Sequence, residues 1–256
     1  MADTDKKLFL LDGMALVYRA HFALIRNPRI ASTGMNTSAV FACTNTLLQI
    51  LGKEEPTHIA AVFDTPEPTM RHVEYPEYKA QREAMPEDLS ACLPYVFRMF
   101  EAFNIPVIKQ PGFEADDIIG TLALQADAQG FRTFMVTPDK DYAQLVSDTA
   151  FMYKPGKSGS GAEVLGVPEI LEGWDIENVD QVRDILGLWG DASDNIPGVP
   201  GIGEKTSKKL IAQFGSIENL LESTHELKGK QKENLETFAE QARLSKRLVT
   251  IVRDVP

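Results

Sequence analysis

The chain has 256 residues, of which 43% are hydrophobic and 25% charged, with a formal net charge of −11 and two cysteines. This is enough apolar sequence for one sizeable core and a smaller lobe. Two cysteines are too few for a disulfide framework, and their spacing is not that of a metal site. No apolar run approaches the ~18 residues that span a bilayer, and the start MADTDKK does not resemble a secretory signal, so we expect a cytoplasmic protein without membrane contact.

Strand and helix patterns alternate over the first two thirds of the chain, which predicts an α/β fold with a mostly parallel, doubly wound sheet. Short apolar strands are expected at 7–11, 58–63, 105–109 and 131–137. Helices are expected directly after the first strand, at 37–52, 89–103 and 114–129, and from about Tyr142. From about residue 168 the pattern becomes almost wholly helical, which predicts a smaller C-terminal lobe.

Two segments depart from this alternation. Residues 65–88 contain four prolines, many charges and few aliphatic side chains, which predicts a long, poorly buried excursion. Excursions of that length are usually functional. Residues 154–163 are rich in glycine and serine and predict a flexible loop.

Three of the predicted strands run into an aspartate, at Asp12, Asp64 and Asp139. The carboxyl ends of the strands in an open α/β sheet border the crevice in which ligands bind. With neighbouring carboxylates, the candidate metal ligands are Asp12, Asp64, Glu114, Asp116, Asp117, Asp139, Asp141, Asp191 and Asp194. Setting these nine charges aside reduces the net charge from −11 to −2, so the acidity of the chain does not exclude DNA as a partner.

So many clustered carboxylates would repel one another and raise one another's pKa unless cations were bound. Carboxylate oxygens are ligands of hard divalent ions such as Mg²⁺, and we expect two such ions, with Mn²⁺ as a substitute. Taken singly, each pair of acids has a simpler interpretation as a turn, a helix cap or an acidic first turn favoured by the helix dipole. The joint occurrence at several predicted strand ends favours the metal site.

The segment NIPGVPGIGEKTSKKL, residues 195–210, predicts a glycine-rich turn between two helices. Its glycines permit tight turning and close backbone approach, and the free N–H groups of the following helix suit a backbone phosphate. The residues assigned to this DNA contact are Gly198, Gly201, Gly203, Lys205, Thr206, Lys208 and Lys209. Such binding should be independent of sequence and sensitive to salt. Packing of two helices is the alternative role of the glycines.

The 65–88 excursion combines cations with aromatic rings, a mixture that suits single-stranded nucleic acid. The side chains concerned are Arg71, His72, Tyr78, Lys79 and Arg82. Glu74, Glu77 and Glu83 dilute this positive charge, so a solvated loop remains an alternative. The excursion follows the strand that ends at Asp64, which indicates that it overhangs the crevice.

With these segments in place, the chain resembles the 5′ nuclease superfamily, which includes flap endonucleases. It is most similar to the amino-terminal 5′→3′ exonuclease domain of bacterial DNA polymerase I. The resemblance covers nearly the full length and rests on the motifs LLDGMALVYRA, FDTP, EYKAQR, EADDIIGTLA, DKDYAQLV and GDASDNIPGVPGIGEKT. Two departures are Pro138, where glycine is common in bacterial relatives, and the Gly/Ser loop 155–162, which looks like an insertion.

The resemblance implies a PIN-like or Rossmann-like nuclease core at 1–180, with a helical arch at about 65–95. It also implies a helical DNA-binding lobe at 181–256, in which a helix–three-turn–helix at about 185–222 holds duplex DNA and a K⁺ ion. The catalytic residues that the resemblance implies are Tyr78, Lys79 and Arg82, at the 5′ strand near the scissile phosphate, and the basic residues Arg19 and Arg71.

The implied function is structure-specific 5′→3′ exonuclease and flap endonuclease cleavage of DNA in replication and repair, by two-metal hydrolysis. The expected substrate is branched or nicked duplex DNA with a 5′ single strand. We expect a monomer, associated with the bacterial nucleoid and covalently continuous with polymerase domains. The alternatives are a free-standing flap endonuclease, a DNA-structure binder without catalysis, and an RNA-cutting nuclease of the PIN type.

Overall fold

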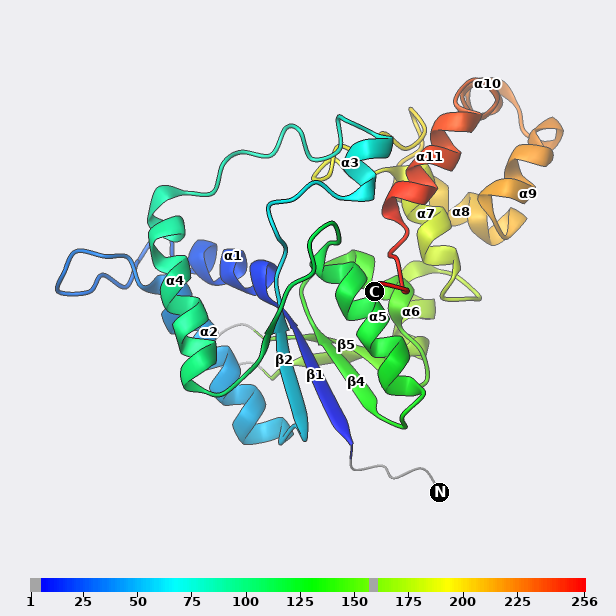
Figure 1. Ribbon diagram of the computed structural model, residues 1–256. Helices are drawn as coiled ribbons and strands as arrows, with labels where there is room; N and C mark the ends of the chain where they lie inside the picture. Colours follow the sequence, from blue (N-terminus) through cyan, green and yellow to red (C-terminus); the bar gives the residue numbers. More distant parts are fainter. Residues whose placement is uncertain (1–5, 157–160) are drawn as a thin grey trace.

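A six-stranded sheet with the strand order β3-β2-β1-β4-β5-β6 lies at the centre of the molecule. The structure, a computed structural model, describes residues 6–156 and 161–256 (Figure 1). The parallel strands are β1 (Lys7–Asp12), β2 (His58–Val62), β3 (Val107–Ile108), β4 (Arg132–Val136) and β5 (Ala150–Lys154). The edge strand β6 (Glu163–Leu165) runs antiparallel to β5. The expected mostly parallel sheet is confirmed.

Both faces of the sheet are buried, because alternate residues of β1 enter different clusters. Phe9 and Leu11 pack in one buried cluster and Leu10 in the other. A parallel strand covered on both faces reads as a continuous apolar run, as LFLL does here. The helices α1 (Gly13–Ala23), α2 (Ser38–Gln49) and α4 (Glu87–Ala102) cover one face, and α5 (Ala115–Asp127) covers the other (Figure 1). The sheet is therefore doubly wound, as expected.

A helical lobe follows the sheet. It contains α6 (Val167–Trp174), α7 (Gln181–Trp189), α8 (Glu204–Phe214), α9 (Ile217–Glu222), the 3₁₀ turn η3 (Thr224–Glu226), α10 (Gly229–Thr237) and α11 (Ala239–Val249). Its buried side chains, among them Ile185 and Leu248, belong to the same hydrophobic cluster as Met135 of β4 and Tyr142. This shared cluster fixes the lobe beside α5, with the end of α11 close to α3 (Met70–Glu74) (Figure 1).

Some elements differ from those expected. The helix expected from about Tyr142 is the 3₁₀ segment η2 (Lys140–Leu145), and the strand expected at 105–109 is only two residues long. Strands β5 and β6 were not expected; they flank the predicted loop, of which residues 157–160 lie outside the described residues. Helix α2 continues into a π-helical turn, η1 (Ile50–Glu54).

The excursion 65–88 is helical only over α3 and at the start of α4. Residues 76–81 form turns and residues 82–86 are irregular, so a short helix and turns, not one continuous helix, rise above the strand ends (Figure 1). Prolines at 76 and 86 account for the interruption, because proline lacks the N–H that continues a helix.

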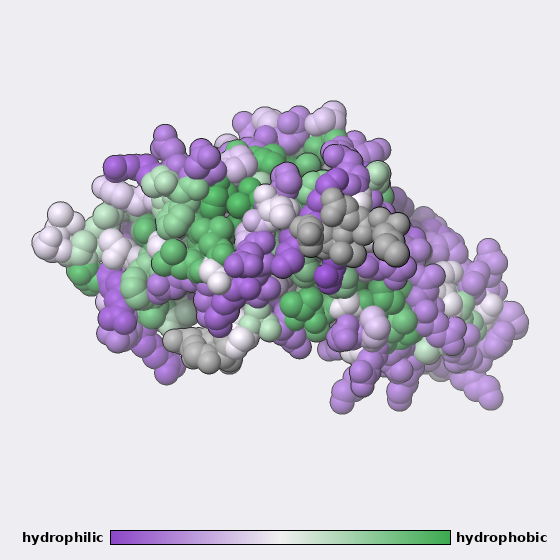
Figure 2. Space-filling model, turned by 90° about the horizontal axis from the view of Figure 1, so that it is seen from below, coloured by the Kyte–Doolittle hydropathy of each residue, from purple (hydrophilic) through white to green (hydrophobic). Residues whose placement is uncertain are grey.

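No helix in the described part of the chain is long and apolar enough to cross a bilayer. Figure 2 views the molecule from the end opposite the arch. Hydrophilic residues predominate over the helical lobe in this view, whereas hydrophobic residues gather over the α/β part. Exposed apolar side chains of the α/β part include Phe41 and Leu48 of α2.

Candidate active site

The three strand-end aspartates are held by hydrogen bonds at the carboxyl edge of the sheet. Asp12, the last residue of β1, caps α1 by accepting from the Ala15 N–H at 3.1 Å and accepts the Thr137 hydroxyl at 3.0 Å. Asp64 follows β2 and accepts from the Ala115 N–H at 2.8 Å. Asp139 begins η2 by accepting from the Asp141 N–H at 3.1 Å. These bonds orient the carboxylates toward one crevice.

A pocket of about 800 Å³ lies at this edge of the sheet. The structure brings seven of the nine expected acids into its lining: Asp12, Asp64, Glu114, Asp116, Asp139, Asp141 and Asp194. Lys79, Arg82 and Lys109 line it too, together with Tyr142. Asp117 and Asp191 do not line it. We refer to this space as the acid pocket.

Burial and mutual repulsion disfavour the charged forms of these carboxylates. Burial, with smaller contributions from Asp64 and Asp139, raises the pKa of Asp12 to about 6. Burial and then the Asp139 charge raise the pKa of Asp141 to about 7. Burial likewise raises the pKa values of Asp116 and Asp139. A group of acids with raised pKa values in a cleft is typical of a functional site.

The donors in the acid pocket fit hard divalent cations. They are carboxylate oxygens, which suit Mg²⁺ or Mn²⁺ better than softer metals. The buried Tyr142 hydroxyl has no hydrogen-bond partner among the described residues, although it lines the pocket. A buried hydroxyl without a partner is costly, so a water or ion-bound water beside it would be stabilising.

The carboxylates are not drawn tightly around a single point. Across residues 6–156 and 161–256, no three His, Cys, Asp or Glu side chains lie close enough together to hold one ion. Mg²⁺ usually keeps several waters and takes only one or two carboxylates directly. The spread of the acids is therefore compatible with ions held partly through water.

Arch residues close over the acid pocket. The Lys79 ammonium lies 2.7 Å from a Glu114 oxygen and 3.5 Å from Asp194. The Arg82 guanidinium lies 2.5 Å from Asp194. The Tyr78 hydroxyl donates to Glu114 or Asp194, each at 3.1 Å. Tyr78, Lys79 and Arg82 thus lie beside the acids, while their expected contact with a 5′ strand stays a prediction.

Asp117 and Arg71 lie behind the pocket and bind each other. Two guanidinium nitrogens of Arg71 contact the two Asp117 oxygens at 2.8 and 2.7 Å, and both side chains are buried. The same carboxylate accepts the backbone N–H groups of Glu114, at 3.2 Å, and Val252, at 2.8 Å. With these bonds, Asp117 has little capacity left for a metal ion, and Arg71 does not line the pocket.

Arg19 also lies outside the acid pocket. It projects from α1, and its guanidinium donates to the carbonyl oxygens of Pro155, at 2.6 Å, and Gly156, at 2.9 Å. These bonds tie the start of the Gly/Ser loop to α1. The structure therefore does not bring Arg19 to the carboxylates.

The glycine-rich turn joins α7 to α8 as expected from the sequence. A β-carbon at Gly198 would lie 2.5 Å from the Gly190 nitrogen, and both glycines have positive φ, so neither position accepts a side chain. Gly203 caps α8, and Gly203, Lys205 and Lys209 are exposed. Lys208 instead donates to Glu204, at 2.8 Å, and to the Gly173 carbonyl, at 3.1 Å.

Two family models together match nearly the whole chain. The model described as 5′-3′ exonuclease, N-terminal resolvase-like domain, matches residues 7–175. The model described as 5′-3′ exonuclease, C-terminal SAM fold, matches residues 177–256. The chain belongs to the 5′–3′ exonuclease family.

The relatives of this 5′–3′ exonuclease chain include much longer proteins. It is 43% identical to DNA polymerase I of Bacillus caldotenax over 254 residues, and 42% identical to that of Bacillus subtilis over 253 residues. Each alignment covers 98% of this chain but only 28% of the relative. The chain therefore spans less than a third of the length of these polymerases.

Solved structures share the fold. A T5 5′-exonuclease with bound zinc matches with a TM-score of 0.77 at 22% identity, covering 95% of this chain and 89% of that one. Flap endonuclease-1 from Methanococcus jannaschii matches with a TM-score of 0.61 at 18% identity, covering 98% and 79%. The fold expected from the sequence is thus confirmed over the matched part of the exonuclease chain.

Lys140 is a site residue of this exonuclease that the sequence analysis missed. Its ammonium binds Asp191 and lies 3.4 Å from Asp141. Burial alone would raise the pKa of Asp191. Lys140 and the Ser193 N–H outweigh burial and hold that pKa below its usual value. Asp191 is therefore linked through Lys140 to the acids of the pocket. The Asp-Lys-Asp sequence at 139–141 was the available signal.

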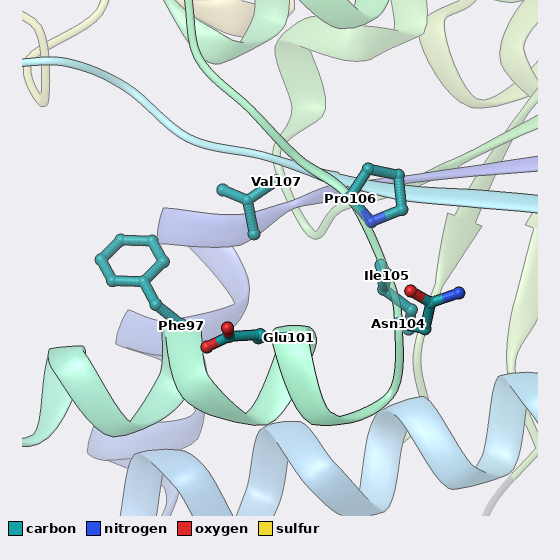
Figure 3. A pocket seen from close by; sticks show the side chains of 6 residues that line it. All are labelled: Phe97, Glu101, Asn104, Ile105, Pro106 and Val107. Atoms are coloured by element: carbon teal, nitrogen blue, oxygen red, sulfur yellow. The ribbon is translucent and has the colours of Figure 1, made fainter.

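A second hollow, of about 550 Å³, lies between the end of α4 and β3 in the exonuclease (Figure 3). It is lined by Phe97, Glu101, Asn104, Ile105, Pro106 and Val107. Phe97 also lines the acid pocket. With one carboxylate and no cation in its lining, this hollow lacks the chemistry of the acid pocket.

Proposed function

We propose that this chain is a structure-specific 5′ nuclease that hydrolyses DNA phosphodiesters with two Mg²⁺ ions. The observation that carries the proposal is the acid pocket itself: seven carboxylates at the carboxyl edge of the parallel sheet, with Lys79 and Arg82 beside them. Membership of the 5′–3′ exonuclease family supports the same assignment. Mn²⁺ should substitute for Mg²⁺, because it accepts the same oxygen ligands.

We assign the acids to two groups by their position. Asp12, Asp64, Glu114 and Asp116 would hold one ion, and Asp141, Asp191 and Asp194 would hold the other. Asp139, or alternatively Asp116, would bridge. When bound, paired divalent ions activate a water and stabilise the leaving oxygen of an in-line displacement. Asp117 is better suited to holding the Glu114 backbone in place than to ligating an ion.

The cationic arch residues would act on the phosphate. Lys79 and Arg82 now neutralise Glu114 and Asp194, and both side chains lie at the pocket. With metal ions on these acids, the Lys79 and Arg82 side chains would be free to turn toward a phosphate. There they would offset the negative charge that develops on it. Tyr78 would keep the arch against the acids. Arg71 supports this segment from behind, and Arg19 fixes the loop at 155–156.

We propose branched or nicked duplex DNA with a 5′ single strand as substrate. The turn between α7 and α8 presents exposed backbone and lysines suited to a duplex backbone, through Gly201, Gly203, Lys205, Thr206 and Lys209, with Gly198 required for the turn. Lys208 would contribute less, since it is already paired. A K⁺ ion at this turn, the monomeric state and the division of the chain at residue 180 remain predictions.

Since the relatives are DNA polymerase I, we propose that the chain serves as the nuclease part of such a polymerase, in replication and repair at the bacterial nucleoid. A neighbouring structure of T5 flap endonuclease, with a TM-score of 0.74, is a complex with DNA and metal ions. A DNA complex of a protein with this fold is compatible with the DNA substrate proposed here.

The proposal is tested by incubating the protein with a 5′-flap DNA, an RNA flap and an unbranched duplex, with Mg²⁺ or with EDTA. We expect Mg²⁺-dependent cleavage of the DNA flap in preference to both others. Binding without cleavage would instead support the non-catalytic DNA binder, and preference for the RNA flap would support the PIN-type ribonuclease.

A further inference from the structure

The segment 77–82 of the arch is docked on the loop 191–195 that follows α7. Backbone carbonyls accept most of these bonds: the Asn195 side-chain amide donates to Glu77 at 2.7 Å, the Lys79 N–H to Asp194 at 2.9 Å, and the Gln81 side-chain amide to Ala192 at 2.8 Å. The Gln81 amide and the Arg82 Nε also donate to the Ser193 carbonyl, each at 3.3 Å. The loop is itself closed by two backbone hydrogen bonds between Asp191 and Ile196. The segment 77–82 is therefore docked on a loop whose own backbone is held by hydrogen bonds.

Two residues of this contact carry an unusual backbone conformation. Lys79 has φ 56° and Asn195 has φ 57°, in the left-handed region that glycine occupies more readily than other residues. Asparagine tolerates this region better than most side chains. Glycine would satisfy the backbone of position 195 equally well, but it could not supply the amide that binds Glu77. The contact therefore explains why a side chain is present there.

The loop 191–195 therefore positions both the aspartates that it carries and the cations of the arch segment docked on it. The loop carries Asp191 and Asp194, and its contacts hold the backbone on which Lys79 and Arg82 stand over the acid pocket. Asn195 does not line that pocket. Without the contact, these two long side chains would have to be ordered by their ion pairs alone, and a partly exposed pair such as Arg82 with Asp194 contributes little.

We propose that Asn195 is a positioning residue, which acts through Glu77 to hold Lys79 and Arg82 in place over the acids. This inference rests on the proposed nuclease function. The effect of Asn195 on cleavage would pass through the two arch cations, since Asn195 itself does not line the acid pocket.

The first test needs neither metal nor DNA. Trypsin cuts after lysine and arginine, so the peptide bonds after Lys79 and Arg82 report whether the segment is docked. In EDTA, Asn195→Gly and Asn195→Asp should be cut there at least about fivefold faster than the parent protein, because a docked backbone is protected from proteolysis. Glycine suits the positive φ and aspartate keeps the shape, so both variants should fold.

Asn104→Gly is the matched control. Asn104 has φ 55° and lies in the turn between α4 and β3, at the second hollow (Figure 3). Its substitution removes an asparagine from the same backbone conformation without touching the arch. Its tryptic pattern and its cleavage of flap DNA should match those of the parent protein. Equal tryptic rates for Asn195→Gly and Asn104→Gly would overturn the docking role of Asn195.

The second test measures coupling. Asn195→Gly should slow single-turnover cleavage of a 5′-flap at least about tenfold. In a Lys79→Ala/Arg82→Ala background the same substitution should slow cleavage less than about threefold, because the side chains that Asn195 positions are already missing. Equal losses in both backgrounds would overturn the positioning role. Absence of cleavage by the parent protein would overturn the proposed function separately, because the tryptic comparison does not depend on it.

Discussion

Arg71 and Asp117 form a buried, two-pronged ion pair behind the acid pocket, with nitrogen–oxygen distances of 2.8 and 2.7 Å. The same guanidinium donates to the Leu248 carbonyl at 2.9 Å and the Thr250 carbonyl at 3.0 Å. One side chain of α3 thus joins the start of α5 to the end of α11. This pair supports the base of the arch and the backbone at Glu114, which lines the pocket.

Arg71→Ala should therefore reduce the free energy of unfolding by about 3–5 kcal/mol, because it leaves the buried Asp117 carboxylate without its cation. Arg247→Ala is the matched control, since Arg247 also joins α11 to α3 through Glu74 but is mostly exposed. Arg247→Ala should reduce the free energy of unfolding by less than about 1 kcal/mol. Urea unfolding of both variants checks this, and equal losses would contradict the structural role of Arg71.

The raised pKa of Asp12 predicts that the metal-free protein loses stability as the pH rises. The folded state binds this proton more tightly than the unfolded state, so the stabilisation is complete below about pH 4 and is lost as the pH passes about 6. Asp12→Asn should thus be more stable than the parent at pH 8 in EDTA, by on the order of 3 kcal/mol, but similar to it at pH 4. Thermal unfolding at both pH values measures the stability difference between Asp12→Asn and the parent. The same difference at pH 4 and pH 8 would contradict the raised pKa of Asp12.

The Lys140 ammonium binds Asp191 and lies beside Asp141, so it should compete with divalent ions for these two acids. Lys140→Met removes this ammonium while keeping an unbranched side chain beside the Trp189 ring, whose centroid lies 5.2 Å from the Lys140 nitrogen. The variant should bind Mn²⁺ about tenfold or more tightly, because unlike the ammonium a methionine repels no cation. Calorimetric titration of the two proteins decides this. Weaker binding would show that Lys140 organises the ligands instead.

The lysines of α8 should differ in their contribution to duplex binding. Lys205→Ala or Lys209→Ala should weaken binding and lower the slope of log affinity against log salt by about 1, as expected for one lost phosphate contact. Lys208→Ala should change the slope less, because its ammonium already binds Glu204 and the Gly173 carbonyl. Titration of a fluorescent duplex at several salt concentrations distinguishes them. Identical slopes for all three variants would be inconsistent with this interface.

The sequence was informative where a local pattern determines geometry. Asp12, Asp64 and Asp139 follow apolar runs, and the carboxyl ends of parallel strands meet at one edge, so their proximity was predictable. The turn around Gly198 was predictable too, since its glycines leave few other backbone choices. The strands β5 and β6 were missed because five and three residues beside a Gly/Ser loop carry little periodicity.

The partners of individual charges could not be predicted. Asp116 and Asp117 are adjacent in an acidic helix start, yet Asp116 lines the pocket and Asp117 faces Arg71, 46 residues away in sequence. Arg19 lies in a motif shared with the family but binds backbone carbonyls at 155–156. Such choices depend on long-range packing, because a carboxylate at a helix start serves a metal, a cap or an ion pair equally well by sequence.

The central claim is that carboxylates at the strand ends hold the ions that cleave DNA. It is tested most directly by Mg²⁺-dependent cleavage of a 5′-flap by Asp139→Ala/Asp141→Ala, with Glu101→Ala/Glu172→Ala as a control that removes two exposed acids elsewhere. We predict that the first variant still binds the flap but cleaves it roughly a thousandfold or more slowly, while the control matches the parent. Cleavage by Asp139→Ala/Asp141→Ala at the parent rate would contradict the assignment.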